Sequence, residues 1–389
     1  MTERKEKMGF YLNNRSKVSL YKSEMLRPYF VDKTLILSEL FPLIESGNSH
    51  ICITRPRRFG KTVMANMIGA FFGKGEDTKN VFEQLKISGH KDYEKHRNKH
   101  DVIYIDFSKM PEDCHSYDQY ISRIVNRLKK DLIREYPDAD YEEEDALWDI
   151  LDCIFDMYDG QKFIFVMDEW DCVFHKTFIT REDQQRYISF LSNLLKDHAY
   201  VELSCMTGIL PIAKYSSGSE LNMFLEYTMA SEEKFNEYFG FTESEVDELY
   251  ERYLKECEIS TITREQLRLW YDGYATKAGE RMYNPRSVVT ALSNNNIGNY
   301  WTSSGPYDKI FYYIKNNIDD VRDDLALMIS GESVPAKVRE YAAVSMNLST
   351  KNEIFSAMVV YGFLSYESGK VRIPNKELME ILLSWNKGM

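Results

Sequence analysis

The sequence lacks long apolar runs, paired cysteine motifs and an excess of positive charge, and each absence excludes a class of function. No stretch of about eighteen apolar residues occurs and the N-terminus is rich in charge, so we expect neither a membrane span nor a secretion signal. The six cysteines are scattered without a Cys-x-x-Cys pair, which argues against a zinc site and a disulfide framework. We therefore expect a reduced, cytoplasmic protein that contacts no membrane.

The charge balance narrows the choice of partners. The formal net charge of −12 argues against a protein that coats a polyanion, although a local basic groove is compatible with it. Residues 91–100 are dense in lysine, arginine and histidine; the pattern fits a solvated link, and the alternative is a contact with nucleic acid. With 389 residues, 43% of them hydrophobic, the chain exceeds one compact core, so we expect two or three domains.

The most informative stretch of the chain reads HICITRPRRFGKT. Its apolar, β-branched residues 51–54 predict a buried strand of a parallel sheet, and Gly60, Lys61 and Thr62 follow after a basic turn. This order is typical of a phosphate-binding loop, in which glycine lets N–H groups approach phosphate, lysine neutralises its charge and threonine offers a hydroxyl to Mg²⁺. Arg55 replaces the usual opening glycine, so the loop alone would also fit an ordinary turn between a strand and a helix.

An acidic pair follows a second apolar strand. Residues 163–167 are entirely apolar and lead into Asp168 and Glu169, the order of a Walker B motif. There the aspartate holds the Mg²⁺ shell, and the glutamate orients and deprotonates the attacking water. Asp171 either faces the same cavity or caps the segment that follows. Each motif alone is common by chance, but the two in this order, each at the end of an apolar strand, predict a nucleotide site.

Several segments resemble motifs of one bacterial family, the AAA-ATPase-like family. Residues 29–34 and 55–62 read YFVDKT and RPRRFGKT, and they are similar to the VDKT segment and the RPRRFGK[ST] loop of that family. Four later segments are similar to its TGV, FGFT, WY-x-GY and YNP motifs: residues 207–209, 239–243, 270–274 and 283–285. The resemblance covers about residues 25–376. It implies that arginine at position 55, in place of the usual glycine, is a feature of the family and does not indicate a lost phosphate-binding site.

The resemblance implies a fold, a cofactor and a relation to a nuclease. The implied fold is α/β, of the P-loop NTPase class and AAA+-like, with a parallel sheet sandwiched by helices and a helical lid after it. The implied activity is that of an ATPase that uses ATP and Mg²⁺. Many members continue into a PD-(D/E)XK nuclease domain, and we expect this chain to end where such a domain would start, just after residues 373–375.

The alternation of strands and helices along the first half of the chain also predicts a parallel sheet with right-handed crossovers. Residues 102–107 and 201–206 are further apolar runs, and capping boxes at Thr242 and Thr263 open two helices of the later part. A helix over 352–361 with a tight hairpin after it predicts a winged-helix module, which either reads DNA or packs as a cap; its few basic residues favour the cap. We expect four parts: a lead-in helix (1–48), the ATPase core (49–215), a helical lid (216–335) and the winged-helix-like module (336–389).

The two motifs assign the binding residues. We expect the nucleotide to contact the loop and the start of the helix after it: Arg57, Arg58, Phe59, Gly60, Lys61, Thr62 and Val63. Thr62 and Asp168 would hold the magnesium ion.

Catalytic roles are expected for four residues: Glu169, Lys61, Thr207 and Arg58. Arg57 and Arg58 could act on the bound nucleotide, act on the nucleotide of a neighbouring copy in a homo-oligomer, or only anchor the loop. Thr207 would sense the γ-phosphate, and the alternative is a threonine that caps a turn. Arg286 falls where lid arginines of AAA+ proteins reach the γ-phosphate, although the family often has an aromatic residue there.

Three functions stay open at this point. The first is an Mg²⁺-dependent ATPase that couples its nucleotide state to the helical and winged-helix parts. The second is a nucleotide-dependent switch or scaffold with little turnover, and the third is an ATPase that acts on nucleic acid with a separate nuclease. The sequence leaves open the client, the oligomeric state and the choice between ATP and GTP.

Overall fold

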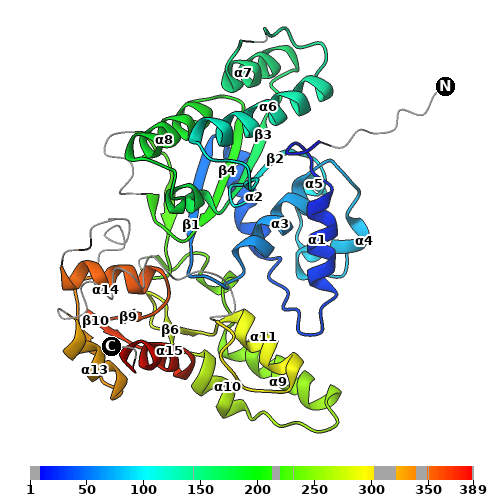
Figure 1. The fold of residues 1–389 in the computed structure, drawn as a ribbon. Helices are drawn as coiled ribbons and strands as arrows, with labels where there is room; N and C mark the ends of the chain where they lie inside the picture. Colours follow the sequence, from blue (N-terminus) through cyan, green and yellow to red (C-terminus); the bar gives the residue numbers. More distant parts are fainter. Residues whose placement is uncertain are drawn as a thin grey trace.

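The computed structural model describes residues 9–142, 144–212, 220–230, 232–301, 321–338, 348 and 350–387. In Figure 1 a sheet with helices on both sides forms the upper part of the molecule, and the later helices form the lower part. None of the helices in these ranges is long and apolar enough to cross a membrane. All six cysteines lie in these ranges, and no two of them are bonded to each other.

Five parallel strands form the central sheet. They are β1 (Ser49–Thr54), β2 (Asp101–Asp106), β3 (Phe163–Asp168), β4 (Val201–Gly208) and β5 (Leu225–Tyr227), in the order β2-β3-β4-β1-β5. The four strands predicted from apolar runs are present, and β5 is a further edge strand that the sequence pattern did not indicate. The predicted α/β fold class is confirmed.

Helices cover both faces of this sheet (Figure 1). One face packs against α1 (Ser16–Met25), α2 (Ile36–Ser46) and α3 (Lys61–Phe72), and the other against α6 (Tyr117–Glu135), α7 (Leu147–Met157) and α8 (Arg181–Leu195). Ile164 and Val166 of β3 pack in the hydrophobic cluster on the face of α1, α2 and α3, whereas Phe165 packs in the cluster on the face of α6, α7 and α8. A strand buried on both faces needs a continuous apolar run, which is why the sequence pattern revealed it. A short 3₁₀ helix, η2 (Trp170–His175), follows β3.

The strand order places the motif residues at one edge of the sheet. β4 lies between β1, which leads towards Lys61, and β3, which ends at Asp168. Ile53 of β1 pairs with Thr207 of β4, and Asp106 of β2 pairs with Asp168. Because the carboxyl ends of parallel strands face the same way, Thr207 lies between the loop and Asp168.

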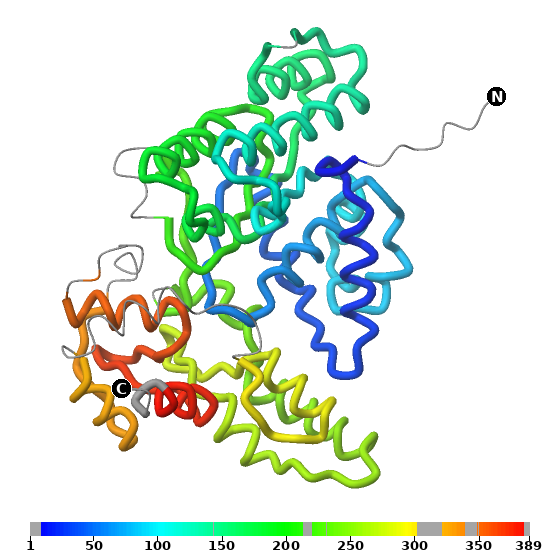
Figure 2. The backbone as a smooth tube through the Cα atoms, viewed as in Figure 1, coloured from blue at the N-terminus to red at the C-terminus, as the bar shows by residue number. Residues whose placement is uncertain are grey.

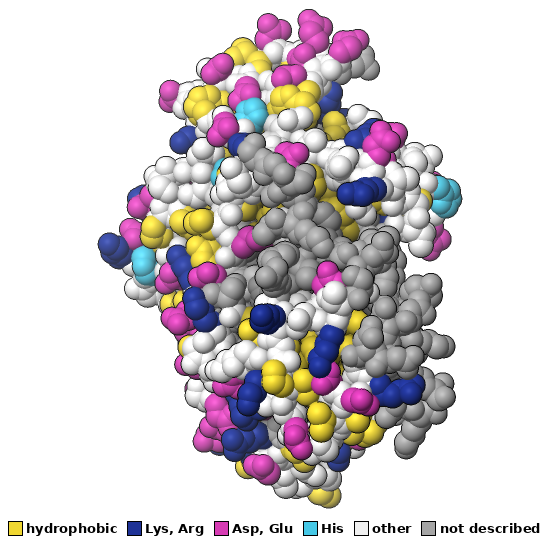
Figure 3. All heavy atoms as spheres, turned by 90° about the vertical axis from the view of Figure 1, so that its left-hand side faces the viewer, with side chains coloured by type: hydrophobic (Ala, Val, Ile, Leu, Met, Phe, Trp, Pro, Cys, Tyr) yellow, Lys and Arg dark blue, Asp and Glu magenta, His cyan; other side chains and the backbone are white. Residues whose placement is uncertain are grey.

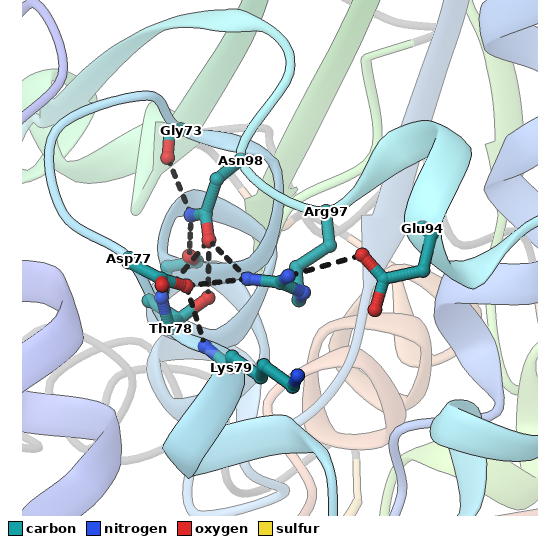
Figure 4. Close-up of polar contacts among 8 residues, drawn as sticks. Gly73, Asp77, Thr78, Lys79, Glu94, Arg97 and Asn98 are labelled. Atoms are coloured by element: carbon teal, nitrogen blue, oxygen red, sulfur yellow. Dashed lines mark hydrogen bonds and ion pairs between the residues drawn. The ribbon is translucent and has the colours of Figure 1, made fainter.

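The segment between α3 and β2 carries three short helices, α4 (Lys79–Phe82), η1 (Lys86–Gly89) and α5 (Tyr93–His96). Figure 4 shows the side chains that hold this segment together. Arg97 donates to Asp77 at 2.6 Å and to Glu94 at 3.0 Å, and Asn98 donates to the carbonyl oxygen of Gly73 at 2.7 Å. The segment is therefore a folded insertion and not a solvated link.

Two histidines of the basic run 91–100 are also used inside the protein. His96 is buried, and its Nδ1 lies 3.1 Å from Nε2 of His100. The other ring nitrogen of His100 lies 2.8 Å from Glu202. These contacts favour a structural role for the run over a contact with nucleic acid.

A largely helical part of the chain follows the sheet where the sequence predicts a lid; we call it the lid, and its role stays a prediction. After η4 (Asn236–Tyr238) it contains α9 (Glu243–Glu256), α10 (Arg264–Tyr271), the hairpin strands β6 (Tyr274–Ala275) and β7 (Arg281–Met282), and α11 (Pro285–Asn294). Thr242 and Thr263 open α9 and α10 with the predicted capping boxes. The side chain of Asn284 caps α11 by accepting from the N–H of Ser287.

The C-terminal part contains α13 (Arg322–Ile329), β8 (Val334–Pro335), α14 (Lys351–Val360), β9 (Ser365–Glu367), β10 (Lys370–Arg372) and α15 (Lys376–Lys387). The three strands form an antiparallel sheet in the order β8-β10-β9. The helix and hairpin expected here are present, and their assignment to a winged helix stays a prediction. Figure 2 shows the red helix α15 beside the yellow-green and yellow lid helices.

One lid glycine shows how closely these parts approach. Gly273 has φ +107°, and an added Cβ would lie 2.0 Å from the carbonyl oxygen of Pro374. Only glycine adopts this backbone conformation without strain, and no side chain would fit the space. The lid and the C-terminal part therefore touch backbone to backbone.

Candidate nucleotide-binding site

The loop between β1 and α3 contains two residues with left-handed backbone. Arg58 has φ +73° and Gly60 has φ +85°, and α3 begins at Lys61. The N-terminal N–H groups of a helix are natural donors to an anion. The ammonium of Lys61 is buried and donates to the carbonyl oxygens of Arg55 at 3.1 Å and Pro56 at 3.2 Å. The loop therefore folds around its lysine.

Arg55, at the position of the missing glycine, is a structural residue. Its side chain is 1% exposed, and it donates to the carbonyl oxygen of Tyr227 in β5 at 2.7 Å and to Oδ1 of Asn236 in η4 at 2.8 Å. Phe59 is also buried, with its ring centroid 4.9 Å from that of Tyr274 in the lid. These two side chains anchor the base and the tip of the loop to the parts of the chain that surround it.

Asp168 lies buried at the end of β3. Thr207 donates to its Oδ1 at 2.5 Å, and the hydroxyl of Thr62 lies close to the same carboxylate. Burial raises the pKa of Asp168, and the two hydroxyls and the charge of Lys61 oppose this shift. Oδ2 of Asp168 is buried and has no hydrogen-bond partner among the residues that the structure describes. A buried oxygen of this kind suits a hard divalent cation.

Glu169 and Asp171 follow on the same turn and have different surroundings. Glu169 has φ +54° and faces the cavity described below; burial raises its pKa, and the charge of Lys61 opposes the shift. Asp171 is buried and accepts from the N–H groups of Ile209 at 3.2 Å and Leu210 at 3.0 Å. These contacts tie Asp171 to the turn after β4; they match neither of its two alternatives, because, within the part of the chain that the structure describes, Asp171 does not line the cavity and caps no N–H group of the segment that follows it.

A cavity of about 460 Å³ adjoins the loop. Residues 57–63, all expected to contact the nucleotide, line it together with Glu169. Tyr29, Phe30 and Phe241 add aromatic surface. Its charged lining side chains are six cations and two carboxylates: Arg27, Lys33, Arg57, Arg58, Lys61, Arg286, Glu24 and Glu169. This lining is positive although the chain carries a net charge of −12. Thr62 connects the cavity to the Asp168 carboxylate.

The structure adds Lys33 to the cavity, a residue that no pattern singled out as a site residue. Its ammonium donates to Glu245, at the start of α9, at 2.6 Å. Burial lowers the pKa of Lys33, and Glu245 opposes the shift. This pair joins the VDKT segment to the first turn of α9, which begins at the end of the FGFT segment, and Phe241 of that segment also lines the cavity.

Lys17, Tyr104 and Asp106 were also missed, and they lie beside Asp168. Nζ of Lys17 lies 3.6 Å from the centroid of the Tyr104 ring. Burial lowers the pKa of Lys17, and the charges of Asp106 and Asp168 oppose the shift. Asp106 ends β2 in the structure, but the predicted strand extended to residue 107, so its carboxylate was not recognised as the end of a strand. The helix α1 carries no motif that points to Lys17.

Comparison with known proteins agrees with this geometry. The family model described as "Predicted AAA-ATPase", AAA-ATPase_like, matches residues 23–217, about half of the chain. The chain belongs to the AAA-ATPase-like family. This AAA-ATPase-like protein is 25% identical over 282 residues to an uncharacterized protein in the vnfD 5′ region of Azotobacter chroococcum mcd 1. The alignment covers 71% of this chain and 51% of that protein, so the chain spans about half the length of this curated relative.

Two solved structures with a similar fold have lower sequence identity to this chain than the curated relative has. A Walker-type ATPase of Pyrococcus abyssi has 10% identity and a TM-score of 0.47, covering 89% of this chain and 94% of that one. The ORC2 protein of Aeropyrum pernix, in its ADPNP and ADP complexes, has 12% identity and a TM-score of 0.37, covering 99% and 96%. The P-loop NTPase fold of this AAA-ATPase-like protein therefore rests on its own strand order, its loop and its family.

Proposed function

We propose that this AAA-ATPase-like protein binds ATP with Mg²⁺ in the cavity beside the loop and hydrolyses it. The observation that carries the proposal is the positive lining of that cavity in an acidic chain, at the carboxyl edge of a parallel sheet and at the start of α3. Ligands of open α/β sheets bind at this edge, and a helix start with a lysine suits a polyphosphate. A volume of about 460 Å³ is in the range of small-molecule sites.

The residues divide the binding work. Backbone N–H groups of residues 58–60 and the Lys61 ammonium would hold the β- and γ-phosphates, with Arg57 and Arg58 beside them. The aromatic side chains of Tyr29 and Phe241 suit the flat apolar surface of a base. Arg286, which lines the same cavity from α11, would neutralise charge at the phosphate end.

The residues present also fit a magnesium ion. Asp168 offers the buried Oδ2 and Thr62 its hydroxyl, both hard oxygen donors. No group of three or more His, Cys, Asp or Glu among the described residues could hold a metal by itself, so phosphate oxygens would complete the site. When bound, the ion would neutralise charge on the transferred phosphoryl group.

Three residues would serve the hydrolysis step. Glu169 would accept a proton from the attacking water at its carboxylate, and a pKa raised by burial makes it a better base. Thr207 would keep Asp168 in place through its 2.5 Å hydrogen bond, and a contact with the γ-phosphate itself is the sensor role expected from the family resemblance. Arg58 would stabilise charge on the phosphate oxygens.

Contacts of the loop support a coupling of nucleotide state to the later parts of the chain. An added Cβ at Gly362 would lie 2.7 Å from Cβ of Pro56, and one at Gly240 would lie 3.1 Å from the Phe59 ring. A phosphate-bearing loop that shifts by a few tenths of an ångström would thus press on the lid and on the C-terminal part. A switch with little turnover uses the same contacts, and single-turnover hydrolysis separates the two functions.

We also propose a division of the chain into residues 1–48, 49–215, 216–335 and 336–389, a winged-helix fold for the last part, a homo-oligomer and a cytoplasmic location. Among the side chains coloured in Figure 3, positive and negative ones are interspersed, which does not favour a nucleic-acid surface on that part of the face. Stimulation of turnover by DNA or RNA would support the nucleic-acid alternative.

Equilibrium binding of labelled ATP tests the proposal. We expect the wild-type protein to bind ATP and the Lys61→Ala variant to lose at least tenfold in affinity, because a buried cation at the phosphates is removed. Lys79→Ala removes an exposed lysine of α4 and should bind as the wild type does. Equal affinity of the Lys61→Ala variant and the wild type would reject the site.

A further inference from the structure

A buried carboxylate joins the C-terminal part to the lid. Glu377, in the first turn of α15, is fully buried. Its carboxylate accepts from the hydroxyl of Ser287 at 2.9 and 3.0 Å, and from the backbone N–H groups of Tyr300 at 2.7 Å and Trp301 at 2.9 Å. The side chain of Asn299 also donates to the backbone oxygen of Glu377 at 3.0 Å. Burial raises the pKa of Glu377 to about 7.

The partner of Glu377 in α11 stands next to the nucleotide cavity. Ser287 follows Arg286, and Pro285, Arg286 and Val289 all line the cavity. The first turn of α11 therefore has residues on the cavity and a residue that is hydrogen-bonded to α15. A movement of this turn changes the place of Arg286 and the Ser287–Glu377 contact together.

Burying a carboxylate in a core costs desolvation free energy. A buried charge must be compensated by donors, and an apolar side chain of similar size would often stabilise the packing more. What the carboxylate adds is direction, because several donors converge on it with fixed geometry. Glu377 thus fixes where Ser287 lies, which apolar packing alone would leave less defined.

We propose that Glu377 is a positioning residue of the nucleotide site: through Ser287 it fixes the start of α11, so that Arg286 is held at the cavity. The C-terminal part thereby sets how tightly the nucleotide is bound. This inference rests on the proposed function, since it assigns Arg286 to the binding of ATP. It adds a residue outside the cavity that acts without touching the ligand.

The test is a double-mutant cycle on ATP affinity and on kcat/KM in the full chain. We expect Glu377→Gln to weaken ATP binding about three- to tenfold, the loss of roughly one hydrogen bond, and Ser287→Ala to act in the same direction. In the Arg286→Ala background the same two substitutions should have little further effect, because the residue through which they act is absent. Glu380→Gln changes an exposed carboxylate one turn along α15 and should leave affinity unchanged.

The non-additivity separates positioning from a general loss of structure. If Glu377 only stabilised the fold, its substitution would weaken binding equally with and without Arg286, and this result would overturn the proposal. If Glu377→Gln does not fold, Ser287→Ala carries the same cycle, since Glu377 keeps its two backbone donors. Wild-type affinity in both Ser287→Ala and Glu377→Gln would also overturn it. Absence of ATP binding by the wild-type protein would instead reject the proposed function.

Discussion

Replacing Arg55 by glycine would restore the residue that usually opens a phosphate-binding loop, and we expect this change to damage the protein. The Arg55 side chain is buried and donates to the carbonyl oxygens of Thr54 and Tyr227, both at 2.7 Å, and to Asn236 at 2.8 Å. Its guanidinium also lies 5.1 Å from the centroid of the Phe239 ring. Glycine would leave these acceptors unpaired around a cavity.

The size of the effect follows from these contacts. A hydrogen bond to a charged group contributes about 1.5–3 kcal/mol, and the desolvation cost of the guanidinium offsets part of the sum. Removal of the guanidinium leaves buried neutral acceptors without their donor, at about 1–3 kcal/mol each, so we expect a net cost of about 3–5 kcal/mol. For a domain of about 150–250 residues each kcal/mol lowers Tm by about 2–4 °C, so we expect a loss of roughly 10 °C.

Thermal unfolding of Arg55→Gly, Arg55→Ala and wild type measures this loss. Arg268→Ala removes an exposed arginine of α10 and controls for the change in charge. We expect both Arg55 variants to melt well below the wild type and the control to melt within about 2 °C of it. If Arg55→Gly melted as the wild type does and bound ATP more tightly, Arg55 would not be the anchor that its contacts indicate.

Three further predictions test separate parts of the account. Burial raises the pKa of Glu377 to about 7 in the folded protein, from an ordinary value of 4.5, so its contribution to the free energy of unfolding is highest below pH 4.5 and falls by roughly 3 kcal/mol as the pH rises to about 7. The Tm of the wild type relative to Glu377→Gln should therefore decrease from pH 5 to pH 8. A Tm difference that is independent of pH would contradict the assignment. Gly362→Ala should lower Tm and weaken ATP binding, because the added Cβ would lie 2.7 Å from Cβ of Pro56. The control Gly331→Ala, at φ +97° with open space around it, should show only the effect of backbone strain. Equal effects of the two substitutions would reject the contact between Gly362 and the loop. Thr207→Val removes the donor to Asp168 and should reduce the affinity for Mg²⁺ in the presence of nucleotide about tenfold, measured by a Mg²⁺ titration of ATP binding. The affinity for metal-free nucleotide should stay unchanged. A Mg²⁺ titration equal to that of the wild type would contradict this role of Thr207.

The sequence predicted the parts of the fold that depend on local patterns. β1 to β4 are buried along nearly all of their length, and the apolar runs within them reveal them. β5 has three residues, of which Leu225 is 58% exposed, and no pattern reveals it. The capping boxes at Thr242 and Thr263 were predicted because their hydrogen bonds join residues three apart in the chain.

The site was predicted where chemistry and position coincide in one segment. Lys61 and Asp168 follow apolar strands, and the strand order brings both ends to one edge of the sheet. Arg27 and Lys33 reach the cavity from the lead-in part, and only tertiary packing brings them there. Asp171 had two alternatives because a pattern does not give the direction of a side chain, and its contacts with the N–H groups of Ile209 and Leu210, distant in the sequence, match neither of them.

The most direct test of the central claim is a crystal structure with a non-hydrolysable ATP analogue and Mg²⁺. We predict that the triphosphate lies on the N–H groups of residues 58–60 with its γ-phosphate at Lys61, and that the metal ion touches Thr62 and Oδ2 of Asp168. A nucleotide bound elsewhere, or a metal ion that does not contact Asp168, would contradict the account.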